Sequence, residues 1–250
     1  MPNLRFAAPR ERRAAVVTGG GRGIGRACAL RMAEEGRDLV IADILDAGAE
    51  LVPEIEAMGG RALFVKTDVS DETSVRSVVD RCVQDFGRLD ILVCCAGILG
   101  LEAPFLDQSS EQFNRVMRVN VYGVYYAHQA AIPHMLAGGW GRCVTITSGA
   151  RLGATNQVPY GVSKGAVHSF IAALGSAYPR QGVFVNGVEP GRALTEMVIP
   201  RFSAEFLANP GTPIGRYADP EEVAEVVAFL CSERNTYTTG SVWSVKGQTG

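Results

Sequence analysis

The chain of 250 residues is 47% hydrophobic and 20% charged, and its formal net charge is −2. This length and apolar content are sufficient for one domain with a large buried core. The balanced charge argues against a nucleic-acid partner, and the longest apolar runs stop well short of the ~20 residues that a membrane span requires.

Residues 1–13 lack the apolar centre of a secretory signal, so we expect a flexible leader there and a single domain over 14–250. The six cysteines form no CxxC pair and no Cys/His cluster, which indicates a reducing compartment, no disulfides and no metal site. The three histidines, His128, His134 and His168, are expected to lie at the surface or at an interface.

Apolar runs alternate with helical patterns along the chain. In chain order, strands are predicted at 14–18, 39–43, 62–68, 89–97, 141–148, 183–191 and 241–245. One helix is predicted from the glycine-rich residues after the first strand to about residue 36, and another from the second strand to about residue 58. Further helices are predicted over 71–86, 110–137, 159–178 and 220–232. The strands are rich in Val, Ile and Leu without a strict alternation, which predicts a parallel sheet covered on both faces. The predicted fold class is therefore α/β, a doubly wound, Rossmann-like sheet in a single domain.

The turn TGGGRGIG (18–25) follows the first predicted strand and opens the first helix. Its glycines allow backbone N–H groups to approach a phosphate, and the N-terminus of the helix adds partial positive charge. This position favours a nucleotide site. A purely structural turn is the alternative, because the spacing Gly19-x-x-x-Gly23-x-Gly25 differs from GxGxxG.

Asp43 ends the second predicted strand, about 20 residues beyond the glycines. An acid at this place can bind both ribose hydroxyls and repels a 2′-phosphate, which favours NAD over NADP. The alternative is a structural role for Asp43, as a helix N-cap or as a turn aspartate before Ile44 and Leu45. Arg22 in the glycine turn opposes the NAD preference, since a guanidinium there could hold a 2′-phosphate.

Tyr160 and Lys164, in the stretch YGVSK, are four residues apart on a predicted helix and therefore share one face. An ammonium beside a phenol favours the ionised phenol, so we expect a lowered pKa for Tyr160 and a usable proton donor and acceptor. The alternative is a tyrosine packed on the aliphatic stem of a surface lysine.

From about residue 14 to residue 246 the motifs, taken in order, resemble those of the short-chain dehydrogenase/reductase family. The residues that match its cofactor-binding segments are Thr18, Gly19, Gly23, Ile24, Gly25, Asp68, Val69, Ala96, Gly97, Pro190, Gly191 and Thr195. The residues that match its active site are Asn120, Ser148, Tyr160 and Lys164.

The resemblance implies an NAD(H)-dependent oxidoreductase that transfers hydride between the nicotinamide and a carbonyl or carbinol carbon. Tyr160 would exchange the proton, Lys164 would hold the nicotinamide ribose, and Ser148 would bind the substrate oxygen. Asn120 would hold a water that links Lys164 to solvent. The alternative is a helix-interior asparagine that bonds to backbone. A homotetramer is expected by the same analogy, and the reducing compartment indicated by the cysteines is expected to be the cytoplasm.

The sequence departs from the family pattern in three places. Cys94 and Cys95 replace two asparagines, the segment from Ser148 to Tyr160 is one residue short, and the tail VWSVKGQTG lacks the acidic-Gly-Gly ending. The short segment makes Thr147 a rival for the role of Ser148.

Apolar residues in the segment 192–215, including Leu194, Met197, Phe202 and Phe206, are expected to contact the substrate. We therefore expect a hydrophobic secondary alcohol and its ketone. A 3-oxoacyl thioester on an acyl carrier protein is the alternative substrate. A non-catalytic dinucleotide-binding regulator is the alternative of another class.

Overall fold

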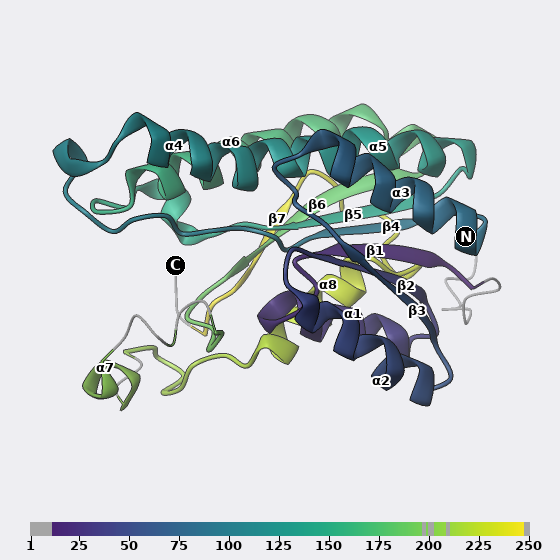
Figure 1. Ribbon diagram of the computed structural model, residues 1–250, viewed down its shortest axis with the longest axis horizontal. Coiled ribbons are helices and arrows are strands. Elements are labelled where there is room, and N and C mark those ends of the chain that lie inside the picture. Colours follow the sequence, from purple (N-terminus) through teal and green to yellow (C-terminus); the bar gives the residue numbers. More distant parts are fainter. Residues whose placement is uncertain (1–11, 197–198, 200–202, 209–210, 248–250) are drawn as a thin grey trace.

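A computed structural model of the chain describes residues 12–196, 199, 203–208 and 211–247 (Figure 1). The first 11 residues of the expected leader, and residues 197–198, 200–202 and 209–210 of the expected substrate segment, lie outside the described part. Met197 and Phe202 are among them, and the side chain of Phe206 is also not described.

The predicted parallel sheet is confirmed. Its strands are β1 (Ala14–Thr18), β2 (Asp38–Asp43), β3 (Arg61–Lys66), β4 (Ile91–Cys94), β5 (Gly141–Ile146), β6 (Val183–Pro190) and β7 (Val242–Val245). They pair in the order β3-β2-β1-β4-β5-β6-β7, and every described pair is parallel. The sheet is thus extended in both directions from β1 and β4, which is the doubly wound, Rossmann-like arrangement.

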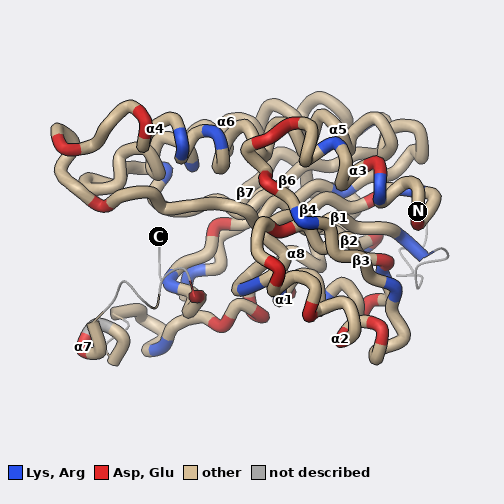
Figure 2. Tube along the Cα trace, in the orientation of Figure 1, with Lys and Arg blue, Asp and Glu red and all other residues tan. Residues whose placement is uncertain are grey.

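Helices cover both faces of the sheet (Figure 1). On one face lie α1 (Gly23–Glu34), α2 (Leu51–Ala57) and α8 (Pro220–Leu230), and on the other lie α3 (Glu72–Phe86), α4 (Ser110–Met117), α5 (Gly123–Ala137) and α6 (Val158–Ala177). The short helix α7 (Ala204–Ala208) stands apart from the sheet at the lower left of Figure 1. Acidic and basic residues are intermixed along the chain (Figure 2), in keeping with the small net charge.

The strands divide the core into two apolar clusters. Val16, Val40 and Leu92 pack against α3, α5 and α6, whereas their neighbours Val17 and Ile41 pack against α1, α2 and α8. Successive side chains of a strand point to opposite faces, so a strand buried on both faces must be apolar at consecutive positions. This explains the continuous apolar runs in the sequence.

The helix predicted over 110–137 has a different form from the one expected. It begins at α4, passes through a π-helical turn (Arg118–Tyr122), and continues as α5. The wider turn holds Asn120, which is buried and binds the backbone of Ile98 across the sheet edge. A π turn inside an α-helix often marks a functional position.

The expectation that the histidines lie at the surface or at an interface is wrong for His128. Its side chain is 1% exposed, because α5 and α6 enclose it and its ring packs edge-on against Phe170 at 5.2 Å. Each helix in the described segments is too short or too polar to span a bilayer.

Candidate active site

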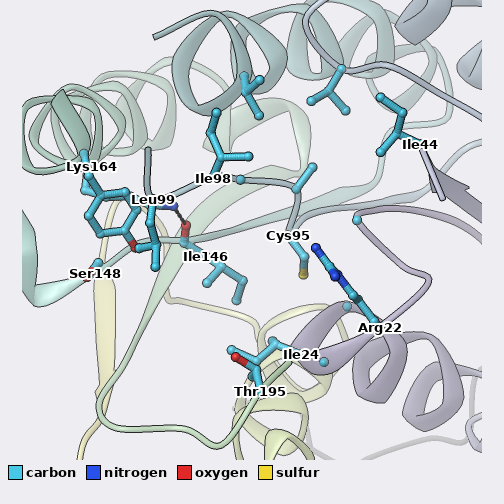
Figure 3. A pocket seen from close by; sticks show the side chains of 18 of the residues that line it. Arg22, Ile24, Ile44, Cys95, Ile98, Leu99, Ile146, Ser148, Lys164 and Thr195 are labelled. Atoms are coloured by element: carbon cyan, nitrogen blue, oxygen red, sulfur yellow. Dashed lines mark hydrogen bonds between the residues drawn. The ribbon is translucent and has the colours of Figure 1, made fainter. Parts of the chain in front are cut away.

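A cavity of about 1390 Å³ lies beyond the carboxyl ends of the central strands (Figure 3). Small-molecule pockets commonly have 300–1,000 Å³, so this cavity has room for a large ligand beside a smaller one. The predicted site residues that line it are Gly19, Arg22, Gly23, Ile24, Gly25, Asp43, Asp68, Val69, Ala96, Gly97, Ser148, Tyr160, Lys164, Pro190, Gly191 and Thr195. Thr18 and Asn120 are absent from its lining.

The glycine turn brings the ends of β1 and β4 into close contact. Gly19 has a φ of +66°, and a Cβ there would lie 2.6 Å from the backbone nitrogen of Ala96. No side chain fits in that space. Backbone therefore forms this wall of the cavity, as a phosphate-binding turn requires.

Asp43 joins the glycine turn to the segment after β2. Its Oδ2 accepts a hydrogen bond from the backbone N–H of Gly21 at 2.9 Å, and its Oδ1 accepts one from Leu45 N–H at 2.9 Å. These are turn contacts, because the residue that precedes the following 3₁₀ helix is Leu45, so Asp43 has a structural role as a turn residue and not as a helix cap. The same carboxylate borders the cavity, so it can also face a ligand there.

Two further side chains of the nucleotide end lie in different surroundings. Asp68 is exposed and accepts hydrogen bonds from the backbone N–H and hydroxyl of Ser70 at 2.9 and 2.7 Å. Arg22 is also exposed and extends into the cavity towards Cys95 (Figure 3). A dinucleotide fits this end chemically, since backbone N–H groups, a guanidinium and two carboxylates line it.

Tyr160 and Lys164 lie one turn apart on α6 and both face the cavity, as their spacing predicts. The ammonium of Lys164 is buried and donates a hydrogen bond to the carbonyl of Ile146 at 2.8 Å (Figure 3). It lies 5.7 Å from the centre of the Tyr160 ring. Burial lowers the pKa of Lys164 to about 8. The ammonium form therefore still predominates at neutral pH.

The pKa of Tyr160 is raised, whereas the sequence analysis expects it to be lowered. Burial of the phenol raises its pKa, and a hydrogen bond with Ser148 opposes that rise without cancelling it. Lys164 does not reverse it, because its ammonium is turned to the Ile146 carbonyl and stands off the ring. At neutral pH Tyr160 is therefore a proton donor.

Ser148 and Thr147 occupy distinct positions. The Thr147 side chain is buried, and its hydroxyl donates to the Val188 carbonyl at 3.3 Å within the sheet. The Ser148 hydroxyl caps the short 3₁₀ turn Gly149–Leu152, accepting from Ala150 N–H at 3.2 Å, and is hydrogen-bonded with Tyr160. Of the two hydroxyls, that of Ser148 stands beside the phenol.

Asn120 connects three segments around the site. Its Oδ1 accepts from Ile98 N–H at 2.8 Å, and its Nδ2 donates to the Ile98 carbonyl at 2.9 Å and to the hydroxyl of Ser163 at 3.0 Å. A Cβ on Gly97 would lie 3.3 Å from Asn120 Oδ1 and 3.8 Å from Lys164 Nζ. The side chain of Asn120 thus fixes the loop after β4 close to Lys164.

The cysteine pair lies between the glycine turn and the central strands. Cys94 is buried, and burial raises the pKa of its thiol to about 12. Cys95 lines the cavity and donates its backbone N–H to the Thr18 carbonyl at 3.0 Å. This backbone bond joins Thr18 to the loop after β4.

Glu189 is a buried acid that the sequence analysis did not single out. It accepts a hydrogen bond from Arg151 Nε at 2.7 Å and forms an ion pair with Lys246. The signal available in the sequence was an acid at the end of an apolar strand, together with a lysine in the tail that departs from the family pattern.

Within the described ranges, no three His, Cys, Asp or Glu side chains gather in a way that could hold a metal ion.

Comparisons with known proteins agree over nearly the whole chain. The model of one protein family, described as enoyl-(acyl carrier protein) reductase, matches residues 19–247. The cis-4-hydroxycyclohexanecarboxylate dehydrogenase of Sinomonas cyclohexanicum is 38% identical over 239 residues, which cover 94% of this chain and 95% of that protein. The cyclohexanol dehydrogenase of Acinetobacter sp. (strain SE19) is 37% identical over 235 residues, which cover 93% of each protein.

The fold is shared with solved structures as well. A 7α-hydroxysteroid dehydrogenase complexed with NADH and 7-oxo glycochenodeoxycholic acid matches with a TM-score of 0.89 and 32% sequence identity, over 94% of this chain and 93% of that one. Fold, motif order and relatives agree, so the chain is an oxidoreductase and belongs to the short-chain dehydrogenase/reductase family.

Proposed function

We propose that the protein is an NAD(H)-dependent dehydrogenase that interconverts a hydrophobic, alicyclic secondary alcohol and its ketone. The observation that carries the proposal is the meeting of Ser148, Tyr160 and Lys164 at one end of a cavity that has the glycine turn and Asp43 at the other. Two relatives are named for six-membered-ring alcohols, which supports this substrate class.

The chain's own residues would hold the cofactor along the cavity. The glycine turn would bind the pyrophosphate, Asp43 the adenosine ribose, and Lys164 the nicotinamide ribose. Asp68 and Val69 would contact the adenine, and Pro190, Gly191 and Thr195 the nicotinamide carboxamide. The nicotinamide supplies the hydride chemistry when it is bound.

Tyr160 would act as the general acid and base. Its buried phenol is protonated at neutral pH, which is the form that donates to a ketone oxygen during reduction. Ser148 would donate a second hydrogen bond to that oxygen and stabilise the charge that develops on it. Asn120 would hold the loop after β4. It would also hold a water that links Lys164 to solvent.

A second candidate is the reduction of a 3-oxoacyl thioester, which the description of the matching family model favours. Reductases of that kind usually take NADPH, and Asp43 would repel its 2′-phosphate. The non-catalytic alternative is disfavoured because the Ser, Tyr and Lys side chains all face one cavity. We place the protein in the cytoplasm as a homotetramer by family analogy.

A substrate panel tests the proposal. The purified protein would be mixed with cyclohexanol, cis- and trans-4-hydroxycyclohexanecarboxylate, a linear secondary alcohol, and an acetoacetyl thioester, each with NAD and NADP in the required redox state. We expect nicotinamide absorbance to change with the ring alcohols and NAD⁺. Turnover confined to the thioester and NADPH would support the second candidate, and no turnover at all would contradict both.

A further inference from the structure

The carboxylate of Glu189 connects three separate segments of the chain. It lies at the end of β6 with 0% of its surface exposed, and it binds Arg151 in the turn after Ser148 and Lys246 after β7. Arg151 and Lys246 are themselves mostly covered, with 26% and 17% of their side chains exposed. The cluster of Glu189, Arg151 and Lys246 is therefore an internal ion network.

The network is held in its charged form. Burial favours the neutral acid, but the hydrogen bonds from Lys246 and Arg151 outweigh that effect and keep the pKa of Glu189 below its usual value. One carboxylate thus faces two cations. If that carboxylate lost its charge, both cations would stay in place without a counter-ion, which is a costly arrangement in a covered site.

This network lies directly behind the wall that carries Ser148. A Cβ on Gly149 would lie 3.8 Å from Glu189 Oε1 and 3.9 Å from Lys246 Nζ, so the ions support that turn from within. The backbone N–H of Arg151 also donates to the Ser148 carbonyl at 3.1 Å. Arg151 therefore binds Ser148 through its backbone and Glu189 through its side chain.

Glu189 is also joined by its own backbone to the other wall of the cavity. Pro190 and Gly191 follow it in the chain and line the cavity, and Gly191 N–H donates to the Val245 carbonyl at 2.8 Å beside Lys246. The three network residues themselves do not border the cavity among the described residues. They can act on a ligand only through the segments that they hold.

The tail lysine, a departure from the family pattern, finds its explanation here. Lys246 stands where the family carries an acid at the end of the last strand, and Glu189 provides the opposite charge on the neighbouring strand. Strands β6 and β7 pair Glu189 with Ser244, which brings the two ends together.

We propose that Glu189 is a positioning residue, which fixes the Ser148 turn through Arg151 and fixes the Pro190–Gly191 segment through its own backbone. This inference rests on the proposed function, since it assigns Ser148 to the substrate oxygen and Pro190–Gly191 to the nicotinamide.

The test compares Glu189→Gln with a matched carboxylate elsewhere. Glu233 binds Arg13 at 2.7 Å and Arg37 at 2.8 Å, near the amino ends of the strands and away from the cavity. We expect Glu189→Gln to lower kcat by between about ten- and a hundredfold, since a displacement of ~1 Å can cost as much, and to raise the Kd for NADH several-fold. Glu233→Gln should lose stability but keep both values.

A second variant separates the two walls. Arg151→Gln leaves the Glu189–Lys246 pair in place and cuts only the link to the Ser148 turn. We expect it to lower kcat, to increase the isotope effect measured with alcohol deuterated at the carbinol carbon, and to leave the Kd for NADH unchanged. Glu189→Asp, which keeps the charge, should recover part of the activity that Glu189→Gln loses.

The outcomes distinguish this inference from the proposed function. If Glu189→Gln folds and matches Glu233→Gln in kcat and in Kd, the positioning role is refuted. If Glu189→Gln does not fold, wild-type kcat in Arg151→Gln refutes it. If the wild type itself oxidises no alcohol, the proposed function fails, and the Kd for NADH of Glu189→Gln, measured by nucleotide fluorescence against Glu233→Gln, still decides the inference.

Discussion

Among single residues, Asp43 offers the clearest test of whether the protein prefers NAD or NADP. Its carboxylate binds two backbone N–H groups and also borders the cavity. Its two oxygens each accept a backbone hydrogen bond at 2.9 Å. Replacement by alanine would remove both bonds together with the charge. Replacement by asparagine removes the charge, keeps nearly the same side-chain shape, and retains one of the two acceptor oxygens.

We predict that Asp43→Asn lowers the affinity for NADH and raises that for NADPH, each by about tenfold, the equivalent of ~1.4 kcal/mol. NADPH should bind better because the repulsion of its 2′-phosphate disappears with the charge, and NADH should bind less well because its ribose hydroxyls lose a charged acceptor. Fluorescence titration of both cofactors measures the change. Asp46→Asn is the control, because Asp46 is exposed and pairs with Lys66. An unaltered preference in Asp43→Asn would mean that Asp43 serves only the turn.

The sequence located most of these side chains but not their electrostatics. The spacing of Tyr160 and Lys164 correctly placed them on one helix face, because helical periodicity is a local property. The direction of the Tyr160 pKa depends on burial and on the Ser148 hydroxyl, which other segments supply. The ion network of Glu189 could not be predicted for a similar reason, since its partners Arg151 and Lys246 are 38 and 57 residues away along the chain.

At the scale of elements, the apolar runs predicted every strand, and the structure shortens several of them. The run predicted as 89–97 gives a strand only over Ile91–Cys94, because the residues beyond it turn to meet the glycine turn. The end of such a strand is set by contacts with a neighbouring loop. The apolar run in the sequence does not show which loop that is. Helix ends were better defined: α3 begins after the capping residue Asp71 and ends before Gly87, whose φ is +75°.

The π turn between α4 and α5 could not be predicted from periodicity alone. Its residues, Arg118–Tyr122, continue the helical pattern of the segment, and the turn widens only where Asn120 reaches Ile98. That contact spans 22 residues of sequence. The signal in the sequence was a polar residue, Asn120, inside an otherwise helical run. The structure shows that Asn120 binds the backbone of Ile98.

At the scale of the whole molecule, the layer of α5 and α6 contains a buried histidine that affects stability. His128 donates from Nδ1 to the Val124 carbonyl at 2.8 Å, and burial lowers its pKa to about 4, although that bond opposes the shift. Unfolding returns the imidazole to its ordinary pKa of about 6.5. Between these values the unfolded chain binds the additional proton, so stability falls as the pH falls.

We predict that the free energy of unfolding decreases by about 3 kcal/mol between pH 6.5 and pH 4 through this group, from a shift of roughly 2.5 units at 1.36 kcal/mol each. Urea denaturation across this range measures the slope. His128→Asn should flatten it, because an asparagine amide can donate to Val124 without titrating. His134→Asn, on the same helix, should retain the slope. Equal slopes in wild type and His128→Asn would contradict the assignment.

The proposed reaction depends on Tyr160 as the proton donor and acceptor in nicotinamide hydride transfer. The most direct measurement is the single-turnover rate of nicotinamide reduction by cyclohexanol, followed by stopped-flow absorbance for wild type and Tyr160→Phe at equal cofactor saturation. We predict that the variant binds NADH as the wild type does and loses about 10²–10⁴-fold in rate, the usual contribution of general acid–base catalysis. A rate close to that of the wild type would mean that Tyr160 does not transfer the proton.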